Sequence, residues 1–384
     1  MNPQHFLNPL FCWGSTITPS YIKIIMPKIN INNLFRHEVL ALSAYHVADA
    51  AGFIKLDAME NPYSWSEDFK QQWLAALKDC ELNRYPDPEA RQLNATIKRV
   101  NGIAEQFDVL LGNGSDEIIQ LLLMALPPTA SVLSTTPSFV MYKQISDSLG
   151  LRYHGVPLLE SFDLDVAALL AVIHEQQPSV IFLAYPNNPT GNLFSEAAII
   201  AIIEASNGLV VIDEAYAPFA DASFMARLGQ YDNLLVMRTV SKLGLAGLRL
   251  GYIAGHPAII EQLNKIRLPY NINILTQASA EFALSNHAVF DEQTQAICAD
   301  RALVFEQLNA LEGITVFPSA ANFILFKTPK GRATEIFLSL KQQNVLIKNL
   351  SPQAGLLTDC LRVTIGKPEE NAAFLAALRN SLES

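Results

Sequence analysis

The sequence is low in charge and has no strongly basic region. Charged residues make up 17% of its 384 residues and hydrophobic residues 50%. A disordered chain needs the opposite balance, so most of this chain can bury a core. The 27 basic and 37 acidic residues leave a net charge of −10, which disfavours a general affinity for nucleic acid or for anionic membranes. An anionic ligand would therefore need a local basic pocket.

Three further features are missing. The four cysteines form no CxxC pair and are too sparse for a disulfide scaffold, so we expect reduced thiols in a cytoplasmic protein. Because no HExxH motif occurs, we expect no metal site. The apolar runs, such as Leu121 to Leu126, which stops at Pro127-Pro128, are too short for a membrane span.

The N-terminal residues lack the periodic hydrophobic pattern of the rest of the chain. Residues 1–32 contain prolines at positions 3, 9, 19 and 27, with no clear period and no secretory-signal pattern. We expect a disordered N-terminal extension here. We also expect the natural chain to start at Met26.

From about residue 100, short apolar runs alternate with helical patterns. This alternation is typical of an α/β fold, in which a mainly parallel sheet is covered by helices on both faces. Residues 61–274 are thus expected to form a large domain. The expected strands are Asp108–Leu111, Ser131–Thr135, Val180–Ala184, Leu209–Ile212, Leu234–Met237 and Tyr252–Ala254.

The C-terminal part has a different pattern. Residues 277–311 read as mostly helical, and strand-like runs then alternate with helices from Ile314 to the last helix, which begins at Pro368. We expect a smaller α+β domain made of residues 33–60 and 275–384.

In open α/β sheets, ligands bind beyond the carboxyl ends of the strands. After Leu111 comes the stretch GNGSDE, residues 112–117. A dinucleotide fingerprint would need glycine where Glu117 stands, so that interpretation is weak. Two glycines before a helix still let backbone N–H groups approach a phosphate, although an ordinary strand–turn–helix junction would have the same sequence.

The next strand ends carry other polar groups. Asn188 lies in a Pro-rich turn after one strand, Asp213 directly follows another, and Ser241, Lys242 and Arg249 follow a third. Each could be an ordinary turn or a solvated strand end. Together, a phosphate cradle, an amide, a buried acid and a loop lysine are the parts that hold pyridoxal phosphate.

The motifs YPNNPTG (185–191), DEAY (213–216) and SKLGLAGLRLGY (241–252), in this order, resemble those of class I/II aminotransferases of fold type I. The resemblance covers about residues 33–384. Within that family the chain most resembles the histidinol-phosphate aminotransferases. That narrower resemblance depends on LDAMENPY (56–63), NRYPDP (83–88), GNGSDE and CLRVTIG (360–366).

The resemblance implies roles for individual residues. Lys242 would form the Schiff base with pyridoxal 5′-phosphate and shuttle the proton, and Asp213 would pair with the pyridine nitrogen. Asn188 and Tyr216 would hydrogen-bond the cofactor's 3′-oxygen and adjust the pKa of the imine, and Tyr216 would be one of the catalytic residues. Phe139 would stack on the ring. The backbone around Gly114, Ser115 and Asp116, with Ser241 and Arg249, would hold the cofactor phosphate. Thr239 would also bind the cofactor, and Tyr85 would reach across a dimer interface toward the neighbouring site.

The resemblance also implies a substrate site. Arg362 would bind the substrate anion, with Tyr45 near a phosphate and Tyr85, Asn188 and Lys348 beside it. Three positions depart from the family pattern. Lys348 stands where Arg is common, Met59 where Asn is frequent, and Lys242 and Arg249 lie seven residues apart where eight is common.

The expected reaction is transamination of histidinol phosphate with 2-oxoglutarate, by a cytoplasmic homodimer without nucleic-acid or membrane partners. Two alternatives stay open. One is another enzyme of the same fold, either an aromatic or general amino-acid aminotransferase or a threonine-phosphate decarboxylase. The other is a non-catalytic, cofactor-binding regulator, which would need an upstream DNA-binding module.

Overall fold

The computed structural model describes residues 29–44 and 49–383, in two units, Met1–Ala41 and Leu42–Ser384. Most of the expected N-terminal extension, residues 1–28, lies outside the described residues. The described part of the first unit contains a 3₁₀ turn, Ile31–Asn33, and the one-turn helix α1, His37–Leu40. The side chain of Asn30 caps the 3₁₀ turn by accepting from the N–H of Asn32.

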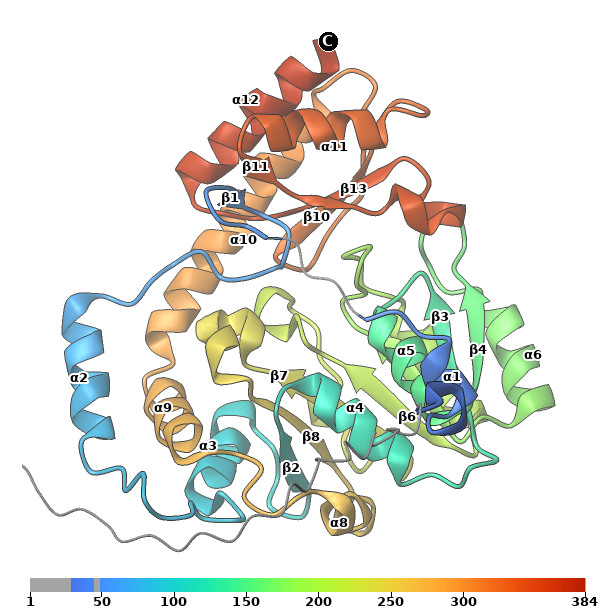
Figure 1. The fold of residues 1–384 in the computed structure, drawn as a ribbon, viewed down its shortest axis with the longest axis vertical. Coiled ribbons are helices and arrows are strands. Elements are labelled where there is room, and N and C mark those ends of the chain that lie inside the picture. Colours follow the sequence, from blue (N-terminus) through green and yellow to red (C-terminus); the bar gives the residue numbers. More distant parts are fainter. Residues whose placement is uncertain (1–28, 45–48, 384) are drawn as a thin grey trace, which may run out of the picture. The chain divides into compact units, whose positions relative to one another are not determined.

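The larger unit is built around a seven-stranded sheet (Figure 1). Its strand order is β2-β8-β7-β6-β5-β3-β4. Every pairing is parallel except those of β8, which runs antiparallel to β2 and β7. The predicted α/β class with a mainly parallel sheet is therefore confirmed. The strands are β2 Asp108–Gly112, β3 Ser131–Thr136, β4 Arg152–Pro157, β5 Val180–Ala184, β6 Leu209–Asp213, β7 Leu234–Thr239 and β8 Gly251–Gly255.

The edge strand β4 was not predicted. Its sequence, RYHGVP, has no apolar run, because only one of its residues is buried. Central strands need side chains that suit burial on both faces, whereas an edge strand is less constrained.

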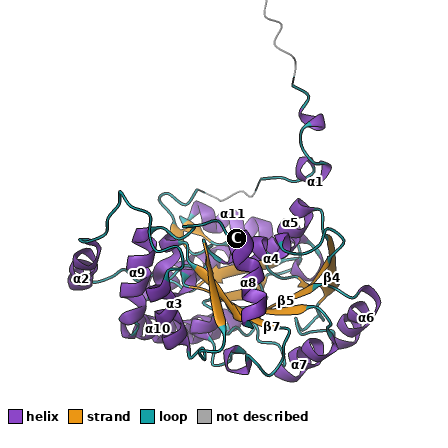
Figure 2. Ribbon diagram, turned by 90° about the horizontal axis from the view of Figure 1, so that it is seen from below, coloured by secondary structure: helices purple, strands orange, loops and turns teal. Residues whose placement is uncertain are grey.

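Helices cover both faces of this sheet (Figure 2). Alternate residues of one strand pack into different core clusters: in β6, Val210 and Ile212 face one cluster and Val211 the other. The first cluster includes residues of α3 Arg91–Asn101, α6 Val166–Gln176, α7 Glu196–Ala205 and α9 Ile274–Ser285, and α2, Glu67–Leu77, packs against α9. The second includes residues of α4 Ser115–Met124, α5 Val140–Leu149 and α8 Pro257–Ile266.

A separate hydrophobic core, distinct from the two clusters on the large sheet, surrounds a four-stranded sheet of order β12-β13-β10-β9 and the short parallel pair of β1 and β11. The region expected to be mostly helical divides into α9 and the longer α10. The elements are β1 Ile54–Lys55, β9 Thr315–Val316, β10 Phe323–Lys327, β11 Val345–Leu346, β12 Lys348–Asn349, β13 Cys360–Thr364, α10 Ala288–Asn309, α11 Ala333–Gln342 and α12 Pro368–Glu383. The division into domains at residues 60 and 275 stays a prediction.

The segment after β7 is irregular. A π-helical turn, Ser241–Leu245, contains Lys242 and is followed by a 3₁₀ turn, Ala246–Leu248. Gly244 has φ 120°, a backbone conformation that L residues with side chains rarely adopt. Asn61 fixes this turn by donating to the carbonyl of Leu243 at 3.0 Å. The lysine is therefore held on a packed turn, as π-helical turns at functional sites often are.

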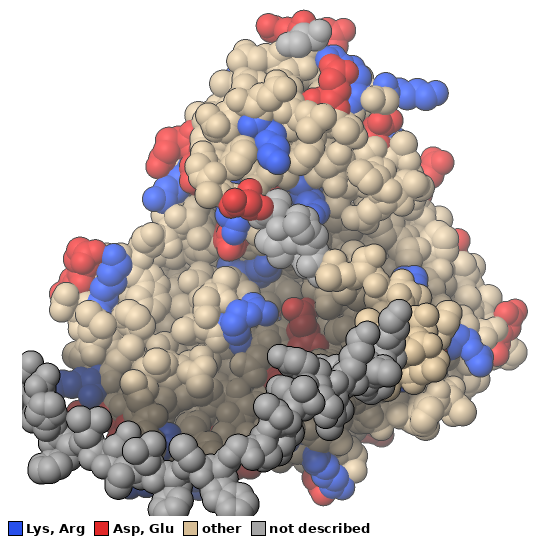
Figure 3. All heavy atoms as spheres, in the orientation of Figure 1, with Lys and Arg blue, Asp and Glu red and all other residues tan. Residues whose placement is uncertain are grey.

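Charges of both signs are interspersed on the face drawn in Figure 3. In the described part of the chain, no helix is long and apolar enough to cross a membrane. Among the same residues, no group of three His, Cys, Asp or Glu side chains could hold a metal ion.

A buried ion pair fixes the ends of β6 and β7. Glu214 is fully buried, and its Oε2 accepts two hydrogen bonds from the guanidinium of Arg238, at 2.9 and 2.7 Å. The hydroxyl of Ser223 and the N–H of Phe224 also donate to this carboxylate. Since this carboxylate on the residue after β6 joins β7 to the loop at Ser223 and Phe224, the pair sets the geometry of the sheet edge next to Asp213.

Replacing Glu214 with Ala should strongly destabilise the protein, because it would leave the Arg238 guanidinium buried without its counter-ion. Breaking a buried pair from one side costs about 3–5 kcal/mol. Urea unfolding would measure the loss. The control is Glu261→Ala, which removes an exposed partner of Lys265 and should cost no more than about 0.5 kcal/mol. Equal losses in the two variants would contradict a structural role for the buried pair.

Candidate active site

A cavity of about 250 Å³ lies at the carboxyl edge of the parallel strands. Its walls come from the ends of β5, β6 and β7, from the start of α4, from the π-helical turn and from residues 58–60. Parallel strands end at the same edge of a sheet, so distant parts of the sequence meet here. The residues that line it include Gly114, Ser115, Asp116, Phe139, Asn188, Asp213, Tyr216, Thr239, Ser241, Lys242 and Arg249.

One end of the cavity is rich in hydrogen-bond donors. Helix α4 begins at Ser115, and no side chain caps its first turn. Free N–H groups at a helix N-terminus, together with the helix dipole, attract anions. Arg249 lies beside them, since a Cβ atom on Gly114 would be 2.7 Å from Arg249 Nη2. A Cβ atom on Gly251 would meet the backbone of Gly114 and Ser115 at 2.7 Å, so glycine is needed there for the close approach of β8 to α4.

Two hydroxyl groups extend this donor-rich end. Thr239 and Ser241 are both buried, and their side-chain oxygens lie 2.9 Å apart. Asp116 also lines the cavity, 3.8 Å from Arg249. Burial raises the pKa of the Asp116 carboxyl, and Arg249 partly offsets that rise. The backbone N–H groups, the hydroxyls and Arg249 thus form a site suited to a phosphate.

Asp213 lies at another wall. As the last residue of β6 it points to the same face as Val211, because side chains alternate along a strand. Its Oδ2 accepts from the hydroxyl of Tyr142 at 2.6 Å, and its Oδ1 accepts from the N–H of Ala215 at 3.1 Å. Burial raises the pKa of Asp213 to about 6, and these two hydrogen bonds act in the opposite direction.

Lys242 projects into the cavity from the π-helical turn. Its Nζ donates to the carbonyl of Ala58 at 3.3 Å and lies 5.8 Å from the centre of the Tyr216 ring. Burial, together with Arg362 and Arg249, lowers the pKa of Lys242 to about 8, whereas Glu60 acts to raise it. A substantial fraction of this amine is therefore uncharged near pH 8, which makes it usable as a base or nucleophile.

Arg362 is connected to the cavity through Asn188. The guanidinium of Arg362 donates to Asn188 Oδ1 at 2.6 Å, and Asn188 Nδ2 donates to the hydroxyl of Tyr216 at 3.1 Å. Arg362 also donates to the carbonyl of Asp57 at 3.1 Å and lies over the ring of Phe323. Burial raises the pKa of Tyr216 despite the opposing effect of Arg362, so its hydroxyl stays protonated at neutral pH.

The structure brings together most, but not all, of the residues expected from the sequence. All eleven that were expected on the cofactor within one chain line the cavity. Lys348, on β12, lies beside Arg362 in the register of the small sheet but does not line the cavity. Tyr85 is 80% exposed and stacks on Tyr270, with ring centres 4.5 Å apart. Tyr45 lies outside the described residues.

Sequence reasoning missed several wall residues. Ala58, Met59 and Glu60 line the cavity from a loop after β1, and their only signal was membership of the LDAMENPY motif. Tyr142 was missed too; it does not line the cavity, but it donates to Asp213, which does. Contacts between loops distant in sequence cannot be found from local patterns.

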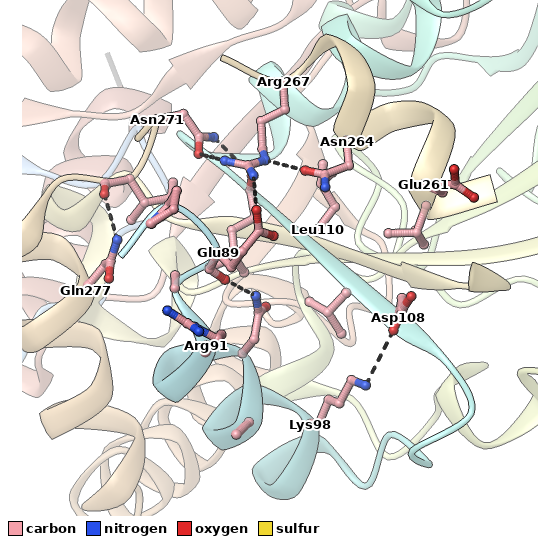
Figure 4. Close-up of a pocket in the computed structure, with 18 of the residues that line it drawn as sticks. Glu89, Arg91, Lys98, Asp108, Leu110, Glu261, Asn264, Arg267, Asn271 and Gln277 are labelled. Carbon is pink, nitrogen blue, oxygen red and sulfur yellow. Dashed lines mark hydrogen bonds and ion pairs between the residues drawn. The ribbon is translucent and has the colours of Figure 1, made fainter. Parts of the chain in front are cut away.

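A larger cavity, of about 500 Å³, lies among α3, β2 and α8 (Figure 4). Two of its cationic side chains lie near acidic ones. Arg267 bonds to Asn264 and Asn271 and lies 3.6 Å from Glu89, and Lys98 lies 3.7 Å from Asp108. The smaller cavity combines a buried acid, a buried amine and an uncapped helix start, so it is the better candidate for chemistry.

Known proteins resemble this chain over nearly its whole length. A histidinol-phosphate aminotransferase 2 from Nitrosococcus oceani is 57% identical over 355 residues, which span 92% of this chain and 99% of that protein. The crystal structure of the histidinol-phosphate aminotransferase from Clostridium acetobutylicum has a TM-score of 0.79 at 25% identity, covering 85% of this chain and 98% of that one.

The fold is also shared with the histidinol-phosphate aminotransferase from Sinorhizobium meliloti in complex with pyridoxal-5′-phosphate. That structure has a TM-score of 0.80 at 23% identity and covers 91% of this chain and 97% of that one. Residues 51–378 match the family of class I and II aminotransferases. This chain therefore belongs to the aminotransferase class I and II family.

Proposed function

We propose that this chain is a pyridoxal 5′-phosphate-dependent enzyme of histidine biosynthesis. It transfers the amino group of histidinol phosphate to 2-oxoglutarate, giving imidazole-acetol phosphate and glutamate. The observation that carries this proposal is a single cavity lined by an anion-binding helix N-terminus, the buried acid Asp213 and the weakly basic amine of Lys242. Relatives named histidinol-phosphate aminotransferase, up to 57% identical to this chain, support this substrate over those of the alternatives.

The cavity fits the cofactor at both of its polar ends. The uncapped start of α4, with Arg249, Thr239 and Ser241, offers donors for a phosphate. Asp213 offers a carboxylate for a protonated ring nitrogen, and Phe139 offers an aromatic wall. Lys242 supplies the amine that binds the aldehyde. Gly114 has no side chain to collide with Arg249, and Gly251 has none to collide with the backbone of Gly114 and Ser115. Arg249 and β8 can therefore both lie close to the start of α4.

When bound, the cofactor supplies an aldehyde that links to amines and a ring that accepts the electron pair released at the substrate α-carbon. The protein supplies the proton transfers and the charges around them. Lys242, uncharged in a large fraction of molecules near pH 8, would take the proton from the substrate α-carbon and deliver one to the carbon that the cofactor aldehyde supplies. Asp213 stabilises positive charge on the ring nitrogen, which favours release of that proton.

Arg362 would bind the anionic end of the substrate. Its hydrogen bonds to Asn188 and to the Asp57 carbonyl hold the guanidinium in place, which lowers the cost of ordering it when an anion arrives. Lys348, next to Arg362 in the sheet register, would add a second positive charge. Asn188 and Tyr216 connect this anion site to the part of the cavity that holds Lys242.

We further propose that the enzyme acts as a homodimer and that its biosynthetic role is carried out in the cytoplasm. Tyr85 supports the dimer, because a large aromatic ring that is 80% exposed and stacked on Tyr270 is unusual for a surface facing only water. Leu82 and Leu268, 70% and 73% exposed, are further apolar side chains on the same two loops. In the dimer, Tyr85 would reach the partner's site, and Tyr45 would contact the substrate phosphate.

A substrate panel tests the proposed function directly. The purified protein loaded with cofactor should form glutamate from histidinol phosphate and 2-oxoglutarate, at a kcat/KM well above that for aromatic amino acids. Release of CO₂ from threonine phosphate, without transamination of histidinol phosphate, would instead support the decarboxylase. Tight cofactor binding with no turnover of any substrate would support the non-catalytic regulator.

Replacing Lys242 with Ala should abolish transamination, because it removes the only base proposed for the α-carbon proton. The phosphate and ring contacts are unchanged, so cofactor should still bind, measured by retention of its absorbance after gel filtration. The matched control is Lys265→Ala, an exposed lysine on α8, which should keep full activity. A Lys242→Ala variant with wild-type turnover would remove this residue from the mechanism.

Replacing Arg362 with Lys should lower kcat/KM for both the phosphate and the dicarboxylate substrate by about tenfold to a hundredfold. Lysine keeps the charge but loses the planar fork, and hydrogen bonds to charged groups contribute about 1.5–3 kcal/mol. Arg301→Lys is the control, because Arg301 donates to the backbone carbonyls of Phe219 and Ala321, which do not line the cavity, whereas Arg362 donates to Asn188, which does. Similar losses in both variants would indicate a structural effect.

A further inference from the structure

Tyr142 holds one oxygen of Asp213 from inside the protein core. The tyrosine is fully buried, and its hydroxyl donates to Asp213 Oδ2 at 2.6 Å. Hydrogen bonds to ionised oxygens are short and about twice as strong as neutral ones. Tyr142 does not line the cavity, so it can influence the chemistry only through its neighbours.

The Tyr142 ring has little freedom to move. It stacks on Phe182 of β5 with ring centres 4.7 Å apart and planes 8° apart. It also meets Phe139 edge-on at 5.5 Å. Phe139 lies three residues earlier, as the N-cap of α5, and lines the cavity. The first turn of α5 and its N-cap therefore carry both an aromatic wall of the cavity and the donor that holds the acid.

Asp213 needs such a donor because its surroundings disfavour charge. Burial raises its pKa, and Asp116 on α4 and Glu214 beside it in the chain raise it further. Glu214 is neutralised on the opposite face of the sheet by Arg238. Tyr142 and the N–H of Ala215 are the two hydrogen-bond donors that act to lower the pKa. Tyr216 also faces Asp213, and both hydroxyls stay protonated because burial raises the pKa of both tyrosines.

We propose that Tyr142 is a positioning residue that acts through Asp213, keeping this carboxylate ionised and fixed in orientation at the wall of the cavity. Its effect on catalysis rests on the proposed function, in which Asp213 faces the cofactor ring nitrogen. Without the Tyr142 donor, Asp213 becomes a stronger base and draws the proton away from that nitrogen. The ring then carries less positive charge and stabilises the α-carbon electron pair less well.

The experiment compares the wild type with Tyr142→Phe, using the full-length chain both free of cofactor and loaded with it. In the cofactor-free chain, ¹³C NMR follows the Asp213 carboxyl, assigned by its loss in Asp213→Asn. Its proton affinity should rise about tenfold to a hundredfold, which shifts the titration midpoint up by about one to two pH units. In the loaded enzyme, the ¹⁵N signal of the ring nitrogen should move toward the unprotonated form. The kcat should fall about tenfold or more, with KM changed less than about threefold.

Two controls separate this role from packing. Tyr231→Phe removes the hydroxyl of a partly buried tyrosine that packs against the other core cluster, and should change neither titration nor kcat. Phe182→Leu removes the stacking partner but not the hydroxyl, so it should lower the unfolding temperature and leave the Asp213 midpoint near that of the wild type.

An unchanged Asp213 midpoint in Tyr142→Phe would overturn the proposal, whatever the activity. If that variant does not fold, the wild type decides: the ring-carbon shift of Tyr142 must follow the same midpoint as Asp213, and independence would overturn the proposal. A wild type that fails to transaminate would refute the proposed function alone, because the cofactor-free titration still tests the link between Tyr142 and Asp213.

Discussion

A fully buried carboxyl group is costly unless donors surround it, and the candidate site depends on the way this cost is met at Asp213. The end of β6 places Asp213 on one face of the sheet and Glu214 on the other. Glu214 is paired by Arg238, whereas the hydrogen bonds to Asp213 from the described residues come from neutral donors, Tyr142 and Ala215. Within this part of the chain, the acid that faces the cavity has no cation in its own hydrogen-bond shell, and a cationic ring is the partner that suits it.

The same edge of the sheet provides local positive charge in a chain that is acidic overall. The chain has a net charge of −10, yet its proposed ligands are anions. The positive elements are concentrated at the cavity: the uncapped start of α4 with Arg249 at one end, and Arg362 with Lys348 behind Asn188. Because Arg362 is buried, salt screens its charge less than it screens the surface charges.

Much of this site could be predicted from the sequence, because the end of each short apolar run marks the end of a strand. Asn188, Asp213 and Lys242 each follow a short apolar run, and the sheet brings such ends together. Direction was harder to predict: the apolar run of β8 reads like its neighbours, yet this strand runs antiparallel to them. The role of Tyr142 could not be predicted either, because an aromatic residue in a helix gives the same local pattern whether it packs on a carboxylate or on leucines.

The loop before α2 illustrates what local patterns cannot supply. The contact of Ala58 with Lys242 joins residues 184 apart in sequence, and that of Met59 with Thr364 joins residues 305 apart. Only the packing of the small sheet against the lysine turn creates them. The resemblance to a family could point to this loop, but the contacts themselves follow from tertiary structure.

Met59 has one more consequence. Its N–H and carbonyl are both fixed, by Thr364 at 2.9 Å and by Asn322 at 3.0 Å, while its side chain lines the cavity. Its φ of 53° suits asparagine or glycine better than methionine. The backbone is thus anchored independently of the side chain, so evolution could alter the wall chemistry at this one position without rebuilding the loop.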